Sequence, residues 1–304
     1  MEFLKFMEGI RTPVGDAFFL FCTLGGEEMM LFGLISVIYW CVNKNLAYRM
    51  TFAYLPSGLA VNTLKITFRI PRPWVRDPSL TIVEKARKSA TGYSFPSGHT
   101  QNATALFGTL SCVSAKKWQK LLFFLVIPLV MLSRTYLGVH TPADVLVSFA
   151  VSILITFGVN LLADKITMTQ KKRLLIASVL MIVAIAITVY TVLLFSNGTI
   201  SEEDAANSMK GYGAGVAFLV CWILETKYIN FDVKCSKLWK QFLKFAIGIG
   251  GILALRAGIK ALFGEATLHG MALMAVCCIR YFLIMLWAML LMPLIIKKWF
   301  QVRS

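Results

Sequence analysis

Residues 142–163 of this chain have the sequence PADVLVSFAVSILITFGVNLLA, in which Asp144 is the one charged side chain. A helix needs about 20 predominantly apolar residues to cross a bilayer. The stretch therefore predicts a transmembrane helix, and Thr141-Pro142 fits the start of one, because proline is favoured at the first helical position.

The same apolar pattern recurs along the chain and predicts nine spans. Their ranges are 28–42, 50–68, 98–115, 119–138, 142–163, 174–195, 210–227, 240–263 and 269–296. Nine spans of about 20 residues account for about 180 residues, close to the 58% of the 304 residues that are apolar. The expected fold class is all-α, a polytopic transmembrane helical bundle.

Composition and charge exclude other classes of protein. Only 15% of the residues are charged, against about 25% in soluble domains, so a soluble fold is not expected. The net charge of +16 would suit nucleic acid, but the 31 Lys and Arg lie at span ends and in one long loop. Membrane lipids, and no nucleic acid, are the expected partners.

The distribution of basic residues predicts the orientation in the membrane. Seventeen Lys and Arg lie in the connections 43–49, 116–120, 164–173, 227–244 and 297–304. The alternate connections 196–209 and 264–270 contain none. Cytoplasmic loops carry the excess of Lys and Arg, so we expect the C-terminus in the cytoplasm and the N-terminus outside.

One expected outer loop is basic against this rule. Its Lys and Arg residues are Lys65, Arg69, Arg72, Arg76, Lys85, Arg87 and Lys88. A chemical role is the first interpretation, and a solvated loop beside anionic lipid headgroups is the second. For Arg69 and Arg76 the two remain open, whereas Lys85, Arg87 and Lys88 are typical of solvated loop charges.

Three polar segments lie at the outer ends of predicted spans. They are Lys65-Ile-Thr-Phe-Arg-Ile-Pro-Arg72-Pro73 (65–73), Pro96-Ser-Gly-His99 (96–99) and Ser133-Arg-Thr-Tyr-Leu-Gly-Val-His-Thr-Pro-Ala-Asp144 (133–144). A helical membrane fold can bring such ends together. We therefore expect one polar cap that contains two histidines, one aspartate and several cations.

The cap has the chemistry of a phosphate site. Lys65, Arg72 and Arg134 supply cations, and the forked donors of Arg suit phosphoryl oxygens. Ser97 and Gly98 lie at a predicted helix start, where free backbone N–H groups and the helix dipole attract an anion.

The histidines suit phosphoryl transfer. His140 and Asp144 are four residues apart and share a helix face, so the carboxylate fixes the tautomer of the ring, whose other nitrogen attacks phosphorus. His99 then protonates the leaving oxygen. Asp144 is the only acid in the three segments, so we expect no metal and no cofactor.

The three segments resemble the signature of the type 2 phosphatidic acid phosphatase superfamily, which includes vanadium haloperoxidases and glucose-6-phosphatase. The pattern is KxxxxxxRP, PSGH and SRxxxxxHxxxD, and each fixed position is present in order. The resemblance implies a nucleophile, its relay partner and a general acid at His140, Asp144 and His99. It implies phosphate-binding residues at Lys65, Arg72, Ser97, Gly98 and Arg134.

The pattern of spans and the resemblance together give the expected domain organisation. We expect an amphipathic lead-in over 1–26, a six-helix phosphatase core over 27–195 and about three additional spans over 196–304. The sequences TLGGE (23–27) and SRTYLGVHT resemble sphingosine-phosphate phosphatases and their bacterial relatives, although PSGH differs from the PSTH usual in that branch.

The expected function is a lipid phosphatase acting on a lipid phosphomonoester or diphosphate at the outer face. The alternatives are a phosphotransferase with a lipid or glycan acceptor, a phosphatase of a soluble sugar phosphate, and a transporter or scaffold, which would tolerate a degraded signature. Phosphatidate, phosphatidylglycerol phosphate, sphingoid phosphate and prenyl diphosphate are all compatible substrates. The sequence makes no prediction of the oligomeric state.

Further charged residues lie in or near the spans. Glu27 and Glu28 either pair with a basic residue of the cap or interact with headgroups. Arg256 and Lys260 share a helix face and, with Arg280, predict a structural ion-pair network, with a secondary lipid or phosphate contact as the alternative.

Overall fold

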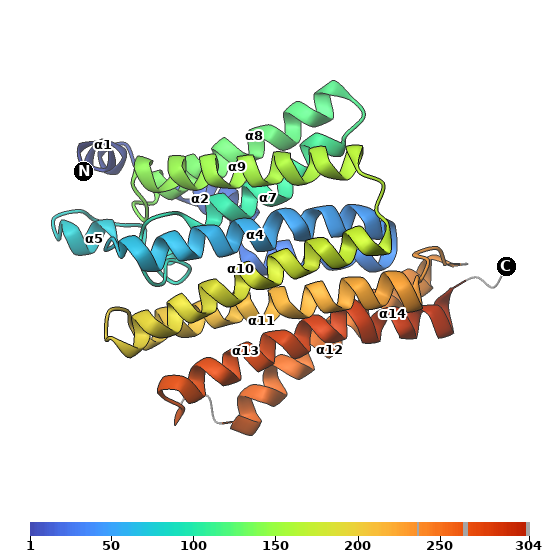
Figure 1. The fold of residues 1–304 in the computed structure, drawn as a ribbon. Coiled ribbons are helices and arrows are strands. Elements are labelled where there is room, and N and C mark those ends of the chain that lie inside the picture. Colours follow the sequence, from blue (N-terminus) through green and yellow to red (C-terminus); the bar gives the residue numbers. More distant parts are fainter. Residues whose placement is uncertain (236, 264–266, 302–304) are drawn as a thin grey trace. The chain divides into compact units, whose positions relative to one another are not determined.

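The computed structural model describes residues 1–235, 237–263 and 267–301 of the chain (Figure 1). Within these ranges it contains helices, connecting loops and one isolated antiparallel bridge between Cys235 and Gln301. The all-α fold class is thereby confirmed. The chain divides into two compact units, the first formed by Met1–Phe32 and Arg49–Ile166, the second by Gly33–Tyr48 and Thr167–Ser304.

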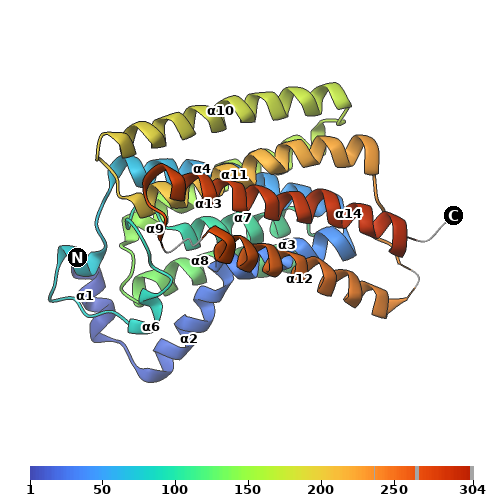
Figure 2. The same ribbon diagram turned by 90° about the horizontal axis from the view of Figure 1, so that it is seen from below.

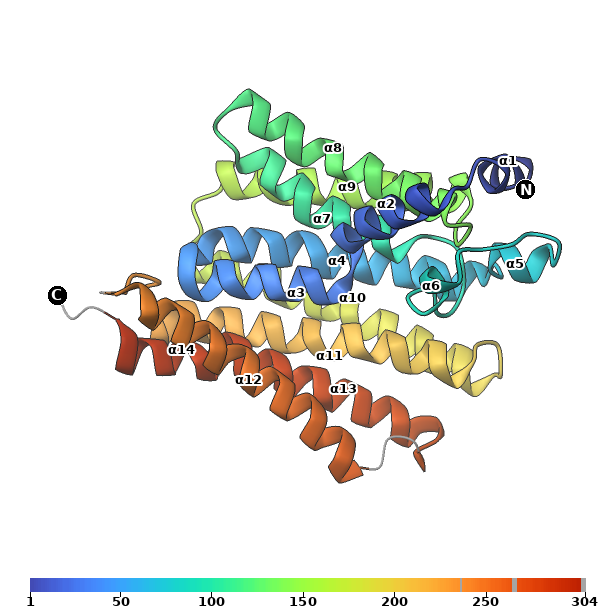
Figure 3. The same cartoon turned by 180° about the vertical axis from the view of Figure 1, so that it is seen from behind.

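The first unit carries the three polar segments. Its helices are α1 (Glu2–Gly9), α2 (Pro13–Thr23), η1 (Leu24–Gly26), the start of α3 (Glu28–Val37), most of α4 (Lys44–Phe68), α5 (Pro73–Arg76), α6 (Glu84–Arg87), α7 (Gly98–Val113), α8 (Lys117–Tyr136) and α9 (Pro142–Lys165). In this unit α7 packs against both α8 and α9, and α2 packs against α8 (Figure 3).

The second unit contains most of the C-terminal helices. They are η2 (Ile38–Val42), α10 (Gln170–Ser196), α11 (Glu202–Leu224), η3 (Glu225–Ile229), α12 (Leu238–Phe263), α13 (Gly270–Leu286), η5 (Trp287–Leu291), α14 (Met292–Ile295) and η6 (Ile296–Phe300). Within this unit α11 lies along α13 (Figure 2). Gly213 makes this possible, because a Cβ at that position would overlap the backbone of Cys278.

Local sequence fixes where the helices of the first unit begin. Ser97 precedes α7, and its hydroxyl accepts from the backbone N–H of Thr100. Thr141 precedes α9 and forms a capping box with Asp144, and Pro142 takes the first helical position. Such caps satisfy N–H groups that have no partner within the helix. The caps thus place 96–99 and 140–144 at helix starts, as the sequence predicts.

Each of the nine ranges expected to span the membrane falls on helical structure. In the described part of the chain, five helices are long and apolar enough to cross a bilayer: α8, α9, α10, α12 and the run from Gly270 to Phe300. The helical segments Pro13–Gly26 and Glu28–Val42 are bent relative to each other at the break between them. If the two segments are counted as one span, the number of spans is six. Multi-pass membrane insertion follows. Residues 13–26, which the sequence assigns to a lead-in, thus combine with the next helix in a broken span or a re-entrant loop.

Helix α7 has 16 residues and is not among these five. Its polar side chains point inward instead: His99, Thr100, Gln101, Thr104 and Thr109 are all buried. A helix enclosed by neighbours needs no apolar surface toward lipid. By contrast α10 has exposed apolar side chains along its length, as a lipid-facing helix requires; they include Leu174, Leu175, Val179, Ile182, Val183, Ile185, Val189 and Leu193.

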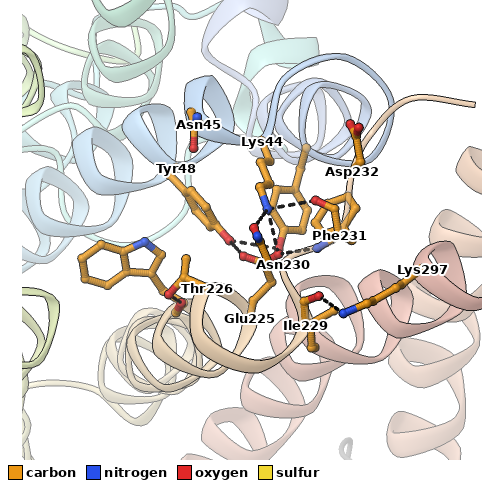
Figure 4. A network of polar contacts seen from close by, with 12 residues as sticks. Lys44, Asn45, Tyr48, Glu225, Thr226, Ile229, Asn230, Phe231, Asp232 and Lys297 are labelled. Atoms are coloured by element: carbon orange, nitrogen blue, oxygen red, sulfur yellow. Dashed lines mark hydrogen bonds and ion pairs between the residues drawn. The ribbon is translucent and has the colours of Figure 1, made fainter. Parts of the chain in front are cut away.

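A buried ion pair joins elements of the second unit (Figure 4). Glu225 is fully buried, and its carboxylate accepts from the Tyr48 hydroxyl, from Lys44 Nζ at 3.2 Å and from the backbone N–H of Phe231 at 3.1 Å. Lys44 Nζ also donates to Asn230 Oδ1 at 2.7 Å. A buried charge is tolerated when it is paired and hydrogen-bonded in this way.

Candidate active site

The three polar segments meet within the first unit. His140 lies in the loop before α9, with Asp144 in the first turn of that helix, and Arg134 lies in the last turn of α8. Arg72 directly precedes α5, and Ser97 precedes α7. The backbone joins two of these segments, because the N–H of Ser97 donates to the carbonyl of Asp144 at 3.0 Å.

His140 and Asp144 form a buried pair. Their side chains are 2% and 3% exposed, and His140 Nδ1 lies 3.3 Å from Asp144 Oδ2. The same oxygen accepts from the Ser94 hydroxyl at 2.5 Å and from the backbone N–H of Thr141 at 2.8 Å. These bonds fix the carboxylate, which in turn fixes the imidazole.

Arg72 contacts the other nitrogen of the same ring. Its Nη1 lies 2.9 Å from His140 Nε2 and 3.2 Å from the carbonyl of Val139. The carbonyls of Gly92 and Thr91 accept from its Nε and Nη2. A guanidinium can only donate, so Nε2 accepts and the ring proton lies on Nδ1, toward Asp144. Nε2 therefore carries the lone pair.

The pKa of His140 is held well below its usual value of 6.5. Burial is the largest cause, because the interior disfavours the charged ring, and the cations Arg72, Arg134 and Lys65 act in the same direction. His140 is therefore neutral at physiological pH, and a neutral ring has a nitrogen lone pair that can attack an electrophile.

Arg134 is fully buried and only partly satisfied. Its Nη1 donates to the Thr23 hydroxyl at 2.8 Å, whereas its Nε and Nη2 have no hydrogen-bond partner among the described residues. Unpaired buried donors on a charged group are costly. The two donors are suited to an anion that enters the site.

His99, on the first turn of α7, contacts a residue outside the three segments. Its Nε2 lies 3.1 Å from Glu27 Oε1. The sequence leaves open whether Glu27 pairs with a basic residue of the polar cap or interacts with lipid headgroups. In the structure the side chain of Glu27 contacts His99. The partners Glu27, Thr23 and Ser94 lie outside the signature, and spacing carries no signal for contacts across such sequence distances.

The remaining cations differ in their surroundings. Lys65 Nζ donates to the carbonyl of Tyr93 at 2.7 Å, beside the cap. Arg69 bonds back to the Ile66 carbonyl of its own helix at 3.0 Å. In the second unit Arg280 is buried on α13 and lies over the Tyr281 ring. The ion-pair network proposed for it stays a prediction, as do the roles of Arg256 and Lys260.

Fold and site together describe a helical membrane protein in which a buried His–Asp pair lies among buried arginines. Comparison with known proteins identifies the family. Residues 46–168 match the PAP2 superfamily, and residues 209–302 match the transmembrane extension of PAP2 superfamily phosphatases. The chain belongs to the PAP2 superfamily.

Individual relatives are enzymes named for lipid phosphates. Phosphatidylglycerophosphatase B of Bacillus subtilis is 28% identical over 134 residues, 41% of this chain and 65% of that protein. Sphingosine-1-phosphate phosphatase 1 of Rattus norvegicus is 30% identical over 214 residues, 66% of this chain and 47% of that protein. The chain spans less than two thirds of the length of these curated relatives.

A solved structure is also similar. The crystal structure of Aquifex aeolicus LpxE shares 27% sequence identity, with a TM-score of 0.47 over 52% of this chain and 92% of that chain.

Proposed function

We propose that this protein is a membrane lipid phosphatase that hydrolyses a lipid phosphomonoester or diphosphate through a phosphohistidine. The observation that carries the proposal is the state of His140. Its Nδ1 donates to Asp144 while its Nε2 faces the Arg72 guanidinium. The names of the relatives, which are phosphatases of phosphatidylglycerophosphate and sphingosine 1-phosphate, support a lipid phosphate as the substrate.

The phosphate group would be held by cations and by a helix start. A phosphoryl oxygen takes over the donor that Arg72 gives to Nε2, which frees that lone pair. The two unpaired donors of Arg134 bind further oxygens. Lys65, the Ser97 hydroxyl and the backbone N–H of Gly98 complete the set, because a helix N-terminus favours an anion.

The reaction then takes two steps. The Nε2 lone pair of His140 attacks phosphorus, the bond from phosphorus to the lipid oxygen breaks, and His99 gives its proton to that oxygen. Asp144 stabilises the charge that develops on the His140 ring. In the second step His99 takes a proton from water, whose oxygen attacks phosphorus as the bond from phosphorus to Nε2 breaks. Phosphate leaves and both histidines return to their first state.

The site is proposed to face the outside, with the C-terminus in the cytoplasm. The asymmetry of Lys and Arg supports this orientation. The core over 27–195 would perform catalysis, with 196–304 as additional membrane helices.

Phosphate release by the purified protein over a panel of lipids tests the proposal. The panel contains phosphatidate, phosphatidylglycerol phosphate, a sphingoid phosphate and a prenyl diphosphate. Wild-type protein should release free phosphate from at least one lipid without an added acceptor. His140→Ala should lower the rate by at least about 10³-fold, because no covalent intermediate forms. Substantial hydrolysis by a folded His140→Ala protein would refute the nucleophile, and transfer that needs an alcohol would indicate a phosphotransferase.

A further inference from the structure

The segment Thr23–Glu27, which joins α2 to α3, makes three hydrogen-bond contacts with α7 and α8, two of them with residues of the candidate site. The Thr23 hydroxyl accepts from Arg134 Nη1 at 2.8 Å, and the carbonyl of Gly26 accepts from Asn102 Nδ2 at 2.8 Å. Glu27 Oε1 lies 3.1 Å from His99 Nε2. The segment therefore contacts the arginine at the end of α8 and the histidine at the start of α7.

Gly26 lets this segment approach α7 closely. A Cβ at residue 26 would lie 2.6 Å from the carbonyl oxygen of His99 and 2.8 Å from its Cβ. Only glycine fits such a gap. The approach brings the carboxylate of the next residue, Glu27, onto the imidazole.

The surroundings of His99 make a carboxylate necessary. Its charged neighbours are Arg134 from the end of α8 and Arg72 from the loop before α5, and His140 faces it from the loop before α9. Burial of the His99 ring and the charges of Arg134 and Arg72 disfavour a positive charge on it. A general acid must carry that charge before it gives up its proton. Glu27, whose side chain is 31% exposed, is the acid in direct contact with the ring.

The two histidines are thus arranged alike. Asp144 holds Nδ1 of His140 and leaves Nε2 for phosphorus. Glu27 holds Nε2 of His99, and within the described residues Nδ1 of His99 has no hydrogen-bond partner. In the proposed reaction, the nitrogen that faces away from the carboxylate is the one that reacts in each ring.

We propose that Glu27 is a positioning residue for His99: it orients the ring and stabilises the imidazolium that delivers a proton from Nδ1 to the leaving oxygen. The inference rests on the proposed phosphatase function. It assigns to residues outside the three-part signature a part in the departure of the leaving group.

Glu27→Gln tests the inference with two leaving groups. Phosphatidate loses a basic alkoxide that needs a proton, whereas p-nitrophenyl phosphate loses a phenolate that does not. The variant should lower kcat for phosphatidate by about 10²-fold, the low end of what general acid catalysis contributes. Its kcat for p-nitrophenyl phosphate should stay within about 3-fold of wild type. Glu28→Gln, at the exposed neighbouring glutamate, is the matched control and should leave both rates unchanged.

The pH profile gives a second measurement. Without the Glu27 charge, the high-pH limb of kcat for phosphatidate should move to lower pH. Glu27→Asp, which keeps the charge on a shorter side chain, should restore part of the rate and the position of the limb. This variant also tests the inference if Glu27→Gln does not yield folded protein.

Three results would contradict the inference. They are an equal loss on both substrates, no loss on either, and an unmoved limb. If the wild-type protein releases phosphate from neither substrate nor from any lipid of the panel, the proposed function itself fails. The two failures are therefore distinguishable.

Discussion

At the scale of single residues, His140 combines two opposed demands. It lies among the cations that would bind the phosphate, and in the proposed mechanism it must stay neutral to attack phosphorus. Burial and the neighbouring cations lower its pKa, and Asp144 holds its proton on Nδ1. In the proposed mechanism, the same groups therefore bind the phosphate and keep His140 neutral for its attack.

The lowered pKa of His140 predicts a dependence of stability on pH. On unfolding, the ring regains its usual pKa of 6.5 and binds a proton below that pH, so the unfolded state binds more protons. The stability that the protein has with a neutral His140 is fully present above pH 6.5, and it is lost as the pH falls toward the pKa of the ring in the folded protein. The Tm of wild type relative to that of His140→Gln should therefore fall between about pH 8 and about pH 5. A Tm difference that is constant over this range would contradict the prediction.

The cationic residues predict the response to ligands. Vanadate adopts the geometry of pentacoordinate phosphorus and should inhibit, because Arg72 and Arg134 bind the equatorial oxygens. EDTA should leave the rate of phosphate release unchanged, since the proposed steps use histidines alone. A strict requirement for added Mg²⁺ would refute this metal-free mechanism.

The contacts of single residues mark the limit of prediction from sequence. The pairing of His140 with Asp144 follows from spacing on one helix. The pairing of His99 with Glu27 does not, because 72 positions separate them and only the packing of η1 against α7 brings them together. Ser94, whose hydroxyl donates to Asp144, belongs to none of the three sequence segments, so no motif predicts its contact with the carboxylate.

At the scale of elements, the approach of η1 to α7 depends on Gly26. Gly26→Ala should force the two elements apart, cost about 1–3 kcal/mol of stability through overpacking and lower activity through His99. Gly33→Ala is the control, since nothing lies within 4 Å of a Cβ there. Thermal unfolding and phosphate release measure both effects. Equal behaviour of the two variants would show that the close approach does not matter.

The network around Glu225 makes a prediction for the second unit. Glu225→Gln leaves Lys44 without its buried counter-charge and should destabilise the protein by about 3–5 kcal/mol. Glu203→Gln, at an exposed glutamate in the first turn of α11, should have little effect. The unfolding midpoint in detergent distinguishes the variants, and a small change for Glu225→Gln would show that the pair contributes little net stability.

Hydropathy is a better predictor of helices that face lipid than of helices that are enclosed by the protein. The apolar stretches α8, α9, α10 and α12 are recognised by length and composition. The bend at Glu27 is missed, because α2 is short and the break carries no proline. The helical state of residues 98–113 is predicted, but which side chains they bury is decided by neighbouring helices.

At the scale of the whole molecule, the Lys and Arg distribution predicts orientation. A fluorescent protein fused after Ser304 should fluoresce, because the cytoplasmic side permits its folding, and alkaline phosphatase fused there should be inactive. An active alkaline phosphatase fusion would reverse the orientation, and with it the face on which the lipid is expected.

The inward polar side chains of α7 have a consequence for biogenesis. Thr100, Gln101 and Thr104 are buried against neighbouring helices, so a nascent α7 alone would expose them to hydrocarbon at a cost. Residues 114–116 join α7 to the strongly apolar α8. We therefore expect the translocon to release the two as a hairpin, so that the core of the first unit is assembled during synthesis rather than after insertion.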